Sequence, residues 1–78
     1  MTTDILAAVT EVITRYFREQ GKAVPVITSE SRIMADLGMD SLALAEIVIS
    51  LEDTTGKDPF AAGFRGFETV GELAALYV

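Results

Sequence analysis

The chain of 78 residues contains no cysteine and no histidine. Without cysteine it can form neither disulfides nor thiolate metal sites, and it has no thiol nucleophile. The absence of histidine removes the most common general base and the most common metal ligand. We therefore expect that the chain is not an enzyme in its own right.

Basic residues are also scarce, since six Lys and Arg stand against twelve Asp and Glu, for a net charge of −6. Nucleic-acid binding requires a positive face, so we expect no nucleic-acid partner. The negative charge favours partner proteins that carry positive patches, because electrostatic attraction speeds their association with the chain. No apolar run reaches membrane-spanning length and no signal sequence follows Met1, so we expect no membrane partner and a cytoplasmic location.

What the chain does have is enough apolar material for a core, because 50% of its residues are hydrophobic. Its length suits one small domain, residues 1–78, near the size at which a single core just suffices. We expect this domain to be a monomer.

Two long segments repeat apolar residues at spacings of three and four, the period of one face of an α-helix. The first helix is predicted to begin after Thr3 or Asp4 and to stop at Gly21. The second is predicted to run from about Ser41 to Thr55 and to end at Gly56.

Two further helices are predicted after Gly56. Asp58 and Pro59 are typical of a helix start, which predicts a short helix over residues 60–64. Thr69 and Glu72 form a capping box for a last helix. The sequence therefore predicts an all-α fold, a small four-helix bundle of three principal helices and one short third helix.

A long loop, residues 22–40, connects the first two helices and shows no sustained period. Connections of this length are uncommon in small domains and are often functional. Ile33 and Leu37 are predicted to anchor the loop to the core, and Gly38 suits a positive φ before the next helix.

The loop ends in Asp36-Leu37-Gly38-Met39-Asp40-Ser41-Leu42, which opens the second helix. Asp40 and Ser41 are both good N-cap residues. A serine here lies beside unpaired backbone N–H groups and the positive end of the helix dipole, where a phosphate ester finds donors. Helix capping alone also explains both residues, so the residues themselves leave the two interpretations open.

The second helix carries apolar residues on two faces. Leu42 and Ile49 are predicted to lie roughly opposite the core face. Glu46 and Asp53 are predicted to lie on the same side of the helix as these two residues. An exposed apolar pair framed by carboxylates is typical of a docking surface, although either residue would also fit beneath the loop or a neighbouring helix. The predicted core face consists of Leu44, Ile47, Val48 and Leu51.

The stretch from Asp36 to Leu42, followed by Glu46-Ile47-Val48-Ile49-Ser50-Leu51-Glu52-Asp53, resembles the acyl carrier protein family, and the resemblance covers nearly the whole chain. It implies that Ser41 carries a 4′-phosphopantetheine arm, which a phosphopantetheinyl transferase moves from coenzyme A. A thioester to the thiol of the arm then holds the acyl cargo. The arm would supply the thiol that the sequence lacks.

The resemblance also implies roles for neighbouring residues. Asp40 matches a position that assists the magnesium site of the transferase. The implied partners are an acyltransferase or ligase, a ketosynthase and other thioester-processing enzymes with basic patches. The positions that match the family's docking residues are Leu42, Glu46, Ile49, Glu52 and Asp53.

The chain departs from carriers of primary fatty-acid synthesis, which often have an acid at the position of Ala43 and an acid-rich run where this chain has Thr54-Thr55-Gly56. These departures favour polyketide or other specialised metabolism over the alternative of a fatty-acid carrier. The entry Gly38-Met39-Asp40 favours an acyl cargo over an aminoacyl or peptidyl one.

Two hypotheses from other classes stay open. An unmodified acidic helical adaptor would bind a basic partner through the second helix, with Ser41 only as a cap. A small enzyme would use a carboxylate pair such as Asp36 and Asp40, but it would lack both histidine and cysteine.

Overall fold

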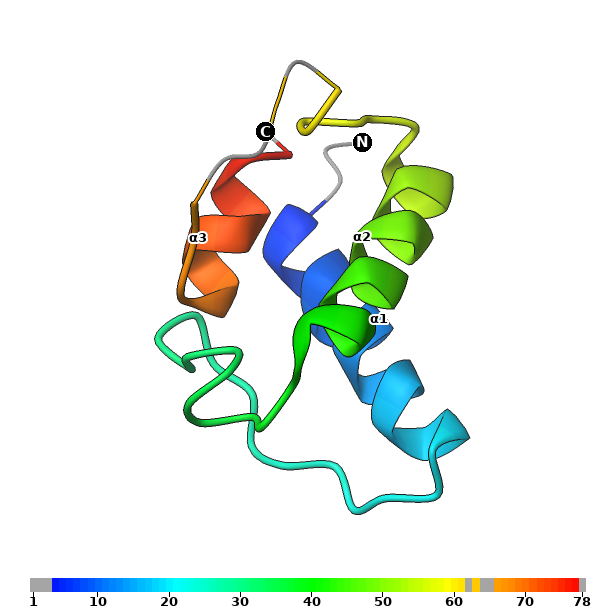
Figure 1. Ribbon diagram of the computed structural model, residues 1–78, viewed down its shortest axis with the longest axis vertical. Helices are drawn as coiled ribbons and strands as arrows, with labels where there is room; N and C mark the ends of the chain where they lie inside the picture. Colours follow the sequence, from blue (N-terminus) through cyan, green and yellow to red (C-terminus); the bar gives the residue numbers. More distant parts are fainter. Residues whose placement is uncertain (1–3, 62, 64–65, 78) are drawn as a thin grey trace.

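The computed structural model describes residues 4–61, 63 and 66–77, and these residues form three α-helices (Figure 1). They are α1 (Ile5–Glu19), α2 (Ser41–Thr55) and α3 (Val70–Ala75). Helix α1 packs against both of the others and is the centre of the bundle. The all-α prediction is confirmed. Within the described part of the chain, none of the helices has the length and apolar character needed to cross a membrane.

The helix ends lie where local capping signals predict them. The Asp4 side chain accepts a backbone hydrogen bond from the first turn of α1. Gly21 and Gly56, which follow α1 and α2, have φ angles of 69° and 70°, in the left-handed region that favours glycine. Thr69 and Glu72 form the reciprocal capping box of α3.

The core draws on all three helices and on the loop between α1 and α2. Ile33 and Leu37 are buried, which confirms both predicted anchors. On α2 the buried face differs from the predicted one, because Ala43 is buried whereas Leu44 and Val48 are half-buried. The buried residues are Val9, Val12, Ile13, Phe17, Ile33, Leu37, Met39, Ala43, Ile47, Leu51, Val70, Leu73, Ala74 and Tyr77.

The expected short helix over residues 60–64 falls partly on residues 62 and 64–65, which lie outside the described residues. Residues 59–61, which include the described start of this segment, form a turn. The Asp58 carboxylate accepts the Phe60 N–H at 3.1 Å, as its predicted capping role requires. Gly63 has a φ of 134°, which is incompatible with a right-handed helix, so no helix continues through it.

The loop between α1 and α2 is held against the start of α3 by backbone hydrogen bonds. Arg32 and Thr69 form an isolated antiparallel bridge, and on either side of it three bonds of 2.8–2.9 Å join the two segments. The Ile33 N–H donates to the Glu68 carbonyl. The N–H groups of Val70 and Gly71 donate to the carbonyls of Ser31 and Ser29, respectively.

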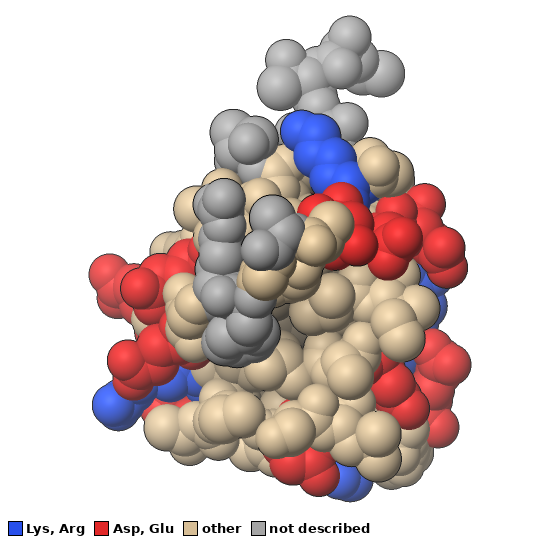
Figure 2. All heavy atoms as spheres, turned by 45° about the horizontal axis from the view of Figure 1, so that its top comes forward, with Lys and Arg blue, Asp and Glu red and all other residues tan. Residues whose placement is uncertain are grey.

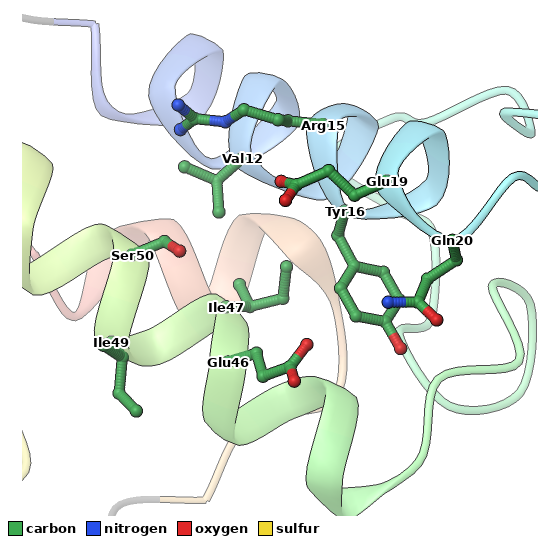
Figure 3. Close-up of a pocket in the computed structure, with 9 residues that line it drawn as sticks. All are labelled: Val12, Arg15, Tyr16, Glu19, Gln20, Glu46, Ile47, Ile49 and Ser50. Carbon is green, nitrogen blue, oxygen red and sulfur yellow. The ribbon is translucent and has the colours of Figure 1, made fainter.

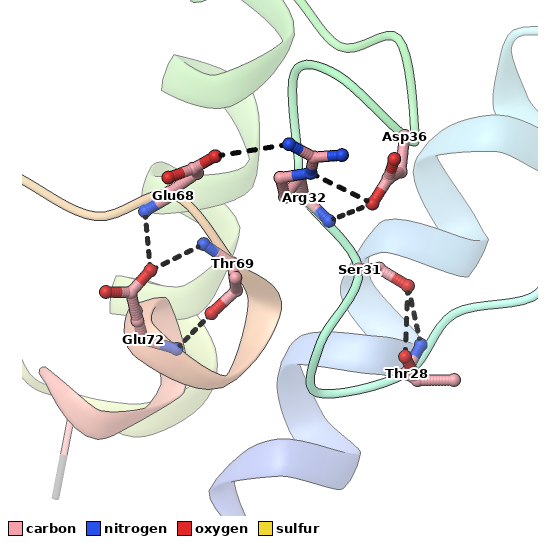
Figure 4. A network of polar contacts seen from close by, with 7 residues as sticks. All are labelled: Thr28, Ser31, Arg32, Asp36, Glu68, Thr69 and Glu72. Atoms are coloured by element: carbon pink, nitrogen blue, oxygen red, sulfur yellow. Dashed lines mark hydrogen bonds and ion pairs between the residues drawn. The ribbon is translucent and has the colours of Figure 1, made fainter.

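Side-chain contacts stabilise each of the two segments, and the ion pair between Arg32 and Glu68 joins them (Figure 4). The Arg32 guanidinium lies 3.6 Å from the Asp36 carboxylate and 3.9 Å from the Glu68 carboxylate. Glu72 accepts the backbone N–H groups of Glu68 and Thr69 at 3.1 and 3.0 Å, which lowers the pKa of its carboxyl. Exposed ion pairs contribute little individually, so the backbone bonds carry most of the attachment.

Gly71→Ala should destabilise the fold even though alanine is the better helix former. A β-carbon at residue 71 would lie 2.9 Å from the Ser29 carbonyl oxygen, closer than real contacts allow. Helix propensity favours alanine by about 1 kcal/mol. Overpacking against backbone costs about 1–3 kcal/mol. We expect the steric term to dominate and the midpoint of urea denaturation to fall.

The matched control is Gly66→Ala, because Gly66 has open space around its α-carbon and no positive φ. That variant should be as stable as the parent or slightly more so. Equal effects of the two substitutions would contradict the role assigned to the contact between Gly71 and Ser29.

Candidate functional site

The last part of the loop turns the chain into α2. The N–H groups of Asp36 and Leu37 both bond the Arg32 carbonyl, at 2.8 and 3.1 Å. The Asp36 carboxylate accepts the Arg32 N–H at 2.8 Å. Gly38 then adopts a φ of 68°, as predicted. Asp36 therefore stabilises this turn, which accounts for its presence without a catalytic role.

Asp40, and not Ser41, is the N-cap of α2. The Asp40 Oδ1 accepts the Ala43 N–H at 2.8 Å, and its backbone carbonyl accepts the Leu44 N–H at 2.9 Å. Ser41 is the first helical residue, and its exposed hydroxyl makes no hydrogen bond to the described residues. The cap is therefore complete without the serine, whose hydroxyl remains accessible to another molecule.

The start of α2 is also suited to an anion. The backbone N–H groups of Ser41 and Leu42 have no acceptor among the described residues. These two donors lie at the positive end of the dipole of a 15-residue helix. A phosphate ester on the Ser41 hydroxyl would thus meet backbone donors and a favourable field. The residues present fit such a group.

An apolar pocket of about 450 Å³ lies next to Ser41. Among the described residues that line it, Ser41 is the one with a hydroxyl, amide or charged side chain. The sequence did not predict this pocket, because its walls come from three separate segments and no local pattern marks them. Its other lining residues are Met34, Leu44, Ala45, Val48, Ile49, Phe60 and Phe67.

The predicted docking residues of α2 lie on the surface. Leu42 is 72% exposed and Ile49 is 61% exposed, so neither packs beneath the loop or another helix. Acidic side chains gather along the side of the molecule that α2 forms (Figure 2). Among the described residues, Glu46, Glu52 and Asp53 are exposed and form no ion pair. This face is open to a partner.

Comparison with known proteins identifies what the chain resembles. The family described as "Phosphopantetheine attachment site" matches residues 5–77. A protein named "Acyl carrier protein" from Saccharopolyspora erythraea is 46% identical over 50 residues. That alignment covers 64% of this chain and 53% of the relative, so the chain matches about half of the relative's length. No solved structure matches the chain.

Proposed function

Because the chain belongs to the phosphopantetheine-attachment-site family, we propose that it is an acyl carrier protein whose 4′-phosphopantetheine group is attached to Ser41. The observation that carries the proposal is the Ser41 hydroxyl, which is exposed at the first residue of α2 and makes no hydrogen bond to the described residues. When bound, the group supplies a terminal thiol on which an acyl cargo is held as a thioester. The protein presents this cargo to enzymes and is not itself an enzyme.

The residues around Ser41 have separate tasks in this proposal. The N–H groups of Ser41 and Leu42, which have no acceptor among the described residues, would hold the phosphate of the attached group. Asp40 keeps the helix start formed through its Oδ1. Its Oδ2 accepts no hydrogen bond from the described residues and is available to the magnesium ion of a phosphopantetheinyl transferase.

The outer face of α2 is the proposed docking surface for partner enzymes. Its exposed leucine and isoleucine provide apolar contact, and its carboxylates attract basic patches. The partners proposed are the transferase, an acyltransferase or ligase, and a ketosynthase or another thioester-processing enzyme. The docking residues are Leu42, Glu46, Ile49, Glu52 and Asp53.

We place this carrier in polyketide or other specialised metabolism, in the cytoplasm. Fatty-acid carriers often have an acidic residue at the position of Ala43. In this chain Ala43 is only 4% exposed, and burying a charged side chain there would cost free energy. The alternatives are a fatty-acid carrier and an aminoacyl or peptidyl carrier.

Modification of Ser41 is tested by intact-mass measurement. The protein is incubated with coenzyme A, magnesium and a broad-specificity phosphopantetheinyl transferase. We expect the mass of one phosphopantetheine to be added, because the hydroxyl is accessible and its surroundings accept a phosphate.

Ser41→Ala should abolish the gain, whereas Ser50→Ala, which removes a half-buried hydroxyl from the same helix, should leave it unchanged. Asp40→Asn keeps an N-cap side chain and should slow the transfer without unfolding the helix. No gain of mass with several transferases would refute the carrier function, whereas a gain that survives Ser41→Ala would refute Ser41 as the attachment site.

Docking on α2 is tested by charge reversal. Glu46→Lys or Asp53→Lys should slow loading of the modified protein by an acyltransferase, by about tenfold at low salt, because steering toward a basic patch is lost. The difference should shrink at high salt, where exposed charges are screened. Glu11→Lys reverses an exposed charge on α1 and is the matched control. Equal rates for the three variants would place docking elsewhere.

The assignment to specialised metabolism is tested with a ketosynthase of primary fatty-acid synthesis. This enzyme should extend an acyl group on the present carrier about tenfold more slowly than on its own carrier, because Ala43 and Thr54-Thr55-Gly56 stand where carriers of that pathway often have acidic residues. Comparable rates would instead support the fatty-acid alternative.

A further inference from the structure

A second depression, a groove of about 370 Å³, lies between α1 and α2 (Figure 3). Val12 from α1 and Ile47 from α2 line it and are almost fully buried, at 3% and 2% exposure, so its base is apolar. Polar and charged side chains from both helices surround this base. The groove therefore offers an apolar base and a charged rim to an incoming group.

The charged side chains of the rim do not form ion pairs with one another. Glu19 from α1 and Glu46 from α2 both line the groove. Neither their carboxylates nor the guanidinium of Arg15, which also lines it, form an ion pair or a side-chain hydrogen bond with the described residues. In Figure 3 the Arg15 guanidinium points away from Glu46. The Tyr16 ring is seen between the side chains of Glu46 and Gln20. The two carboxylates thus approach the groove from opposite helices, and the Tyr16 ring borders it.

We propose that this groove receives an arginine side chain of a partner enzyme, which adds a contact on α1 to the docking face of α2. The methylene stem would cover Val12 and Ile47, as long basic side chains cover apolar surface. The guanidinium would lie between the two carboxylates and against the half-buried ring of Tyr16. Arginine fits better than lysine, because its planar group donates in several directions, stacks on aromatic rings and is weakly hydrated.

The groove is continuous with the proposed docking face. Ile49 lines both this groove and the apolar pocket beside Ser41. Glu46 belongs to both the groove and the docking face. A partner that covers α2 near Ser41 would therefore reach the groove without a separate binding event. The identity of the partner as a thioester-processing enzyme rests on the proposed carrier function, whereas the groove's preference for a guanidinium does not.

The preference is tested by NMR titration of the ¹⁵N-labelled protein with N-acetyl-arginine amide. We expect the backbone amide signals of residues 15–20 and 46–50 to shift and to saturate in the millimolar range, as a single exposed contact implies. N-acetyl-citrulline amide, which has a similar shape and no charge, should cause much smaller shifts. Glu19→Gln should weaken binding of the arginine compound about two- to fivefold.

The matched control is Glu11→Gln, which removes an exposed carboxylate of α1 that does not line the groove, and it should leave the affinity unchanged. Equal weakening by the two substitutions, equal shifts with citrulline, or shifts spread over every acidic surface would overturn the proposal. The titration uses protein without phosphopantetheine, so its outcome is independent of whether Ser41 is modified.

Discussion

The position of Ser41 depends on the backbone hydrogen bonds between residues 29–33 and the start of α3. The loop that precedes α2 has no regular structure of its own, and fixing such a segment costs conformational entropy. The bonds to α3 and the burial of Ile33, Leu37 and Met39 offset that cost. Since the loop leads directly into Asp40, the site is held by contacts to α3, which lies far from it in the sequence.

Features with local causes could be predicted from the sequence. The limits of α1 and α2 follow from an aspartate at each start and a glycine after each end, because capping involves only neighbouring residues. The position of Leu42 and Ile49 away from the core face follows from helical periodicity, whereas their exposure required the packed structure. The choice of Asp40 over Ser41 as the cap could not be predicted, since either side chain is able to accept the same N–H groups.

Features that depend on distant segments could not be predicted. Helical periodicity predicts Leu44 and Val48 to be core residues. In the folded chain they line a pocket together with Phe60 and Phe67, which come from a distant part of the sequence. Gly71 reads as a weakness in a helix, whereas its missing β-carbon leaves room for the Ser29 carbonyl. The groove between α1 and α2 escaped prediction for the same reason, because its two carboxylates are neighbours only after folding.

The Ser41 hydroxyl makes no hydrogen bond to the described residues, and this has a consequence for how partner enzymes would recognise the proposed carrier. A group attached there, as we propose, would break no hydrogen bond between described residues and would leave the Asp40 cap of α2 in place. Enzymes that act before and after the attachment would therefore meet the same exposed face of α2. They would distinguish the two forms by contact with the attached group itself, so the order in which they act would be set within their own active sites.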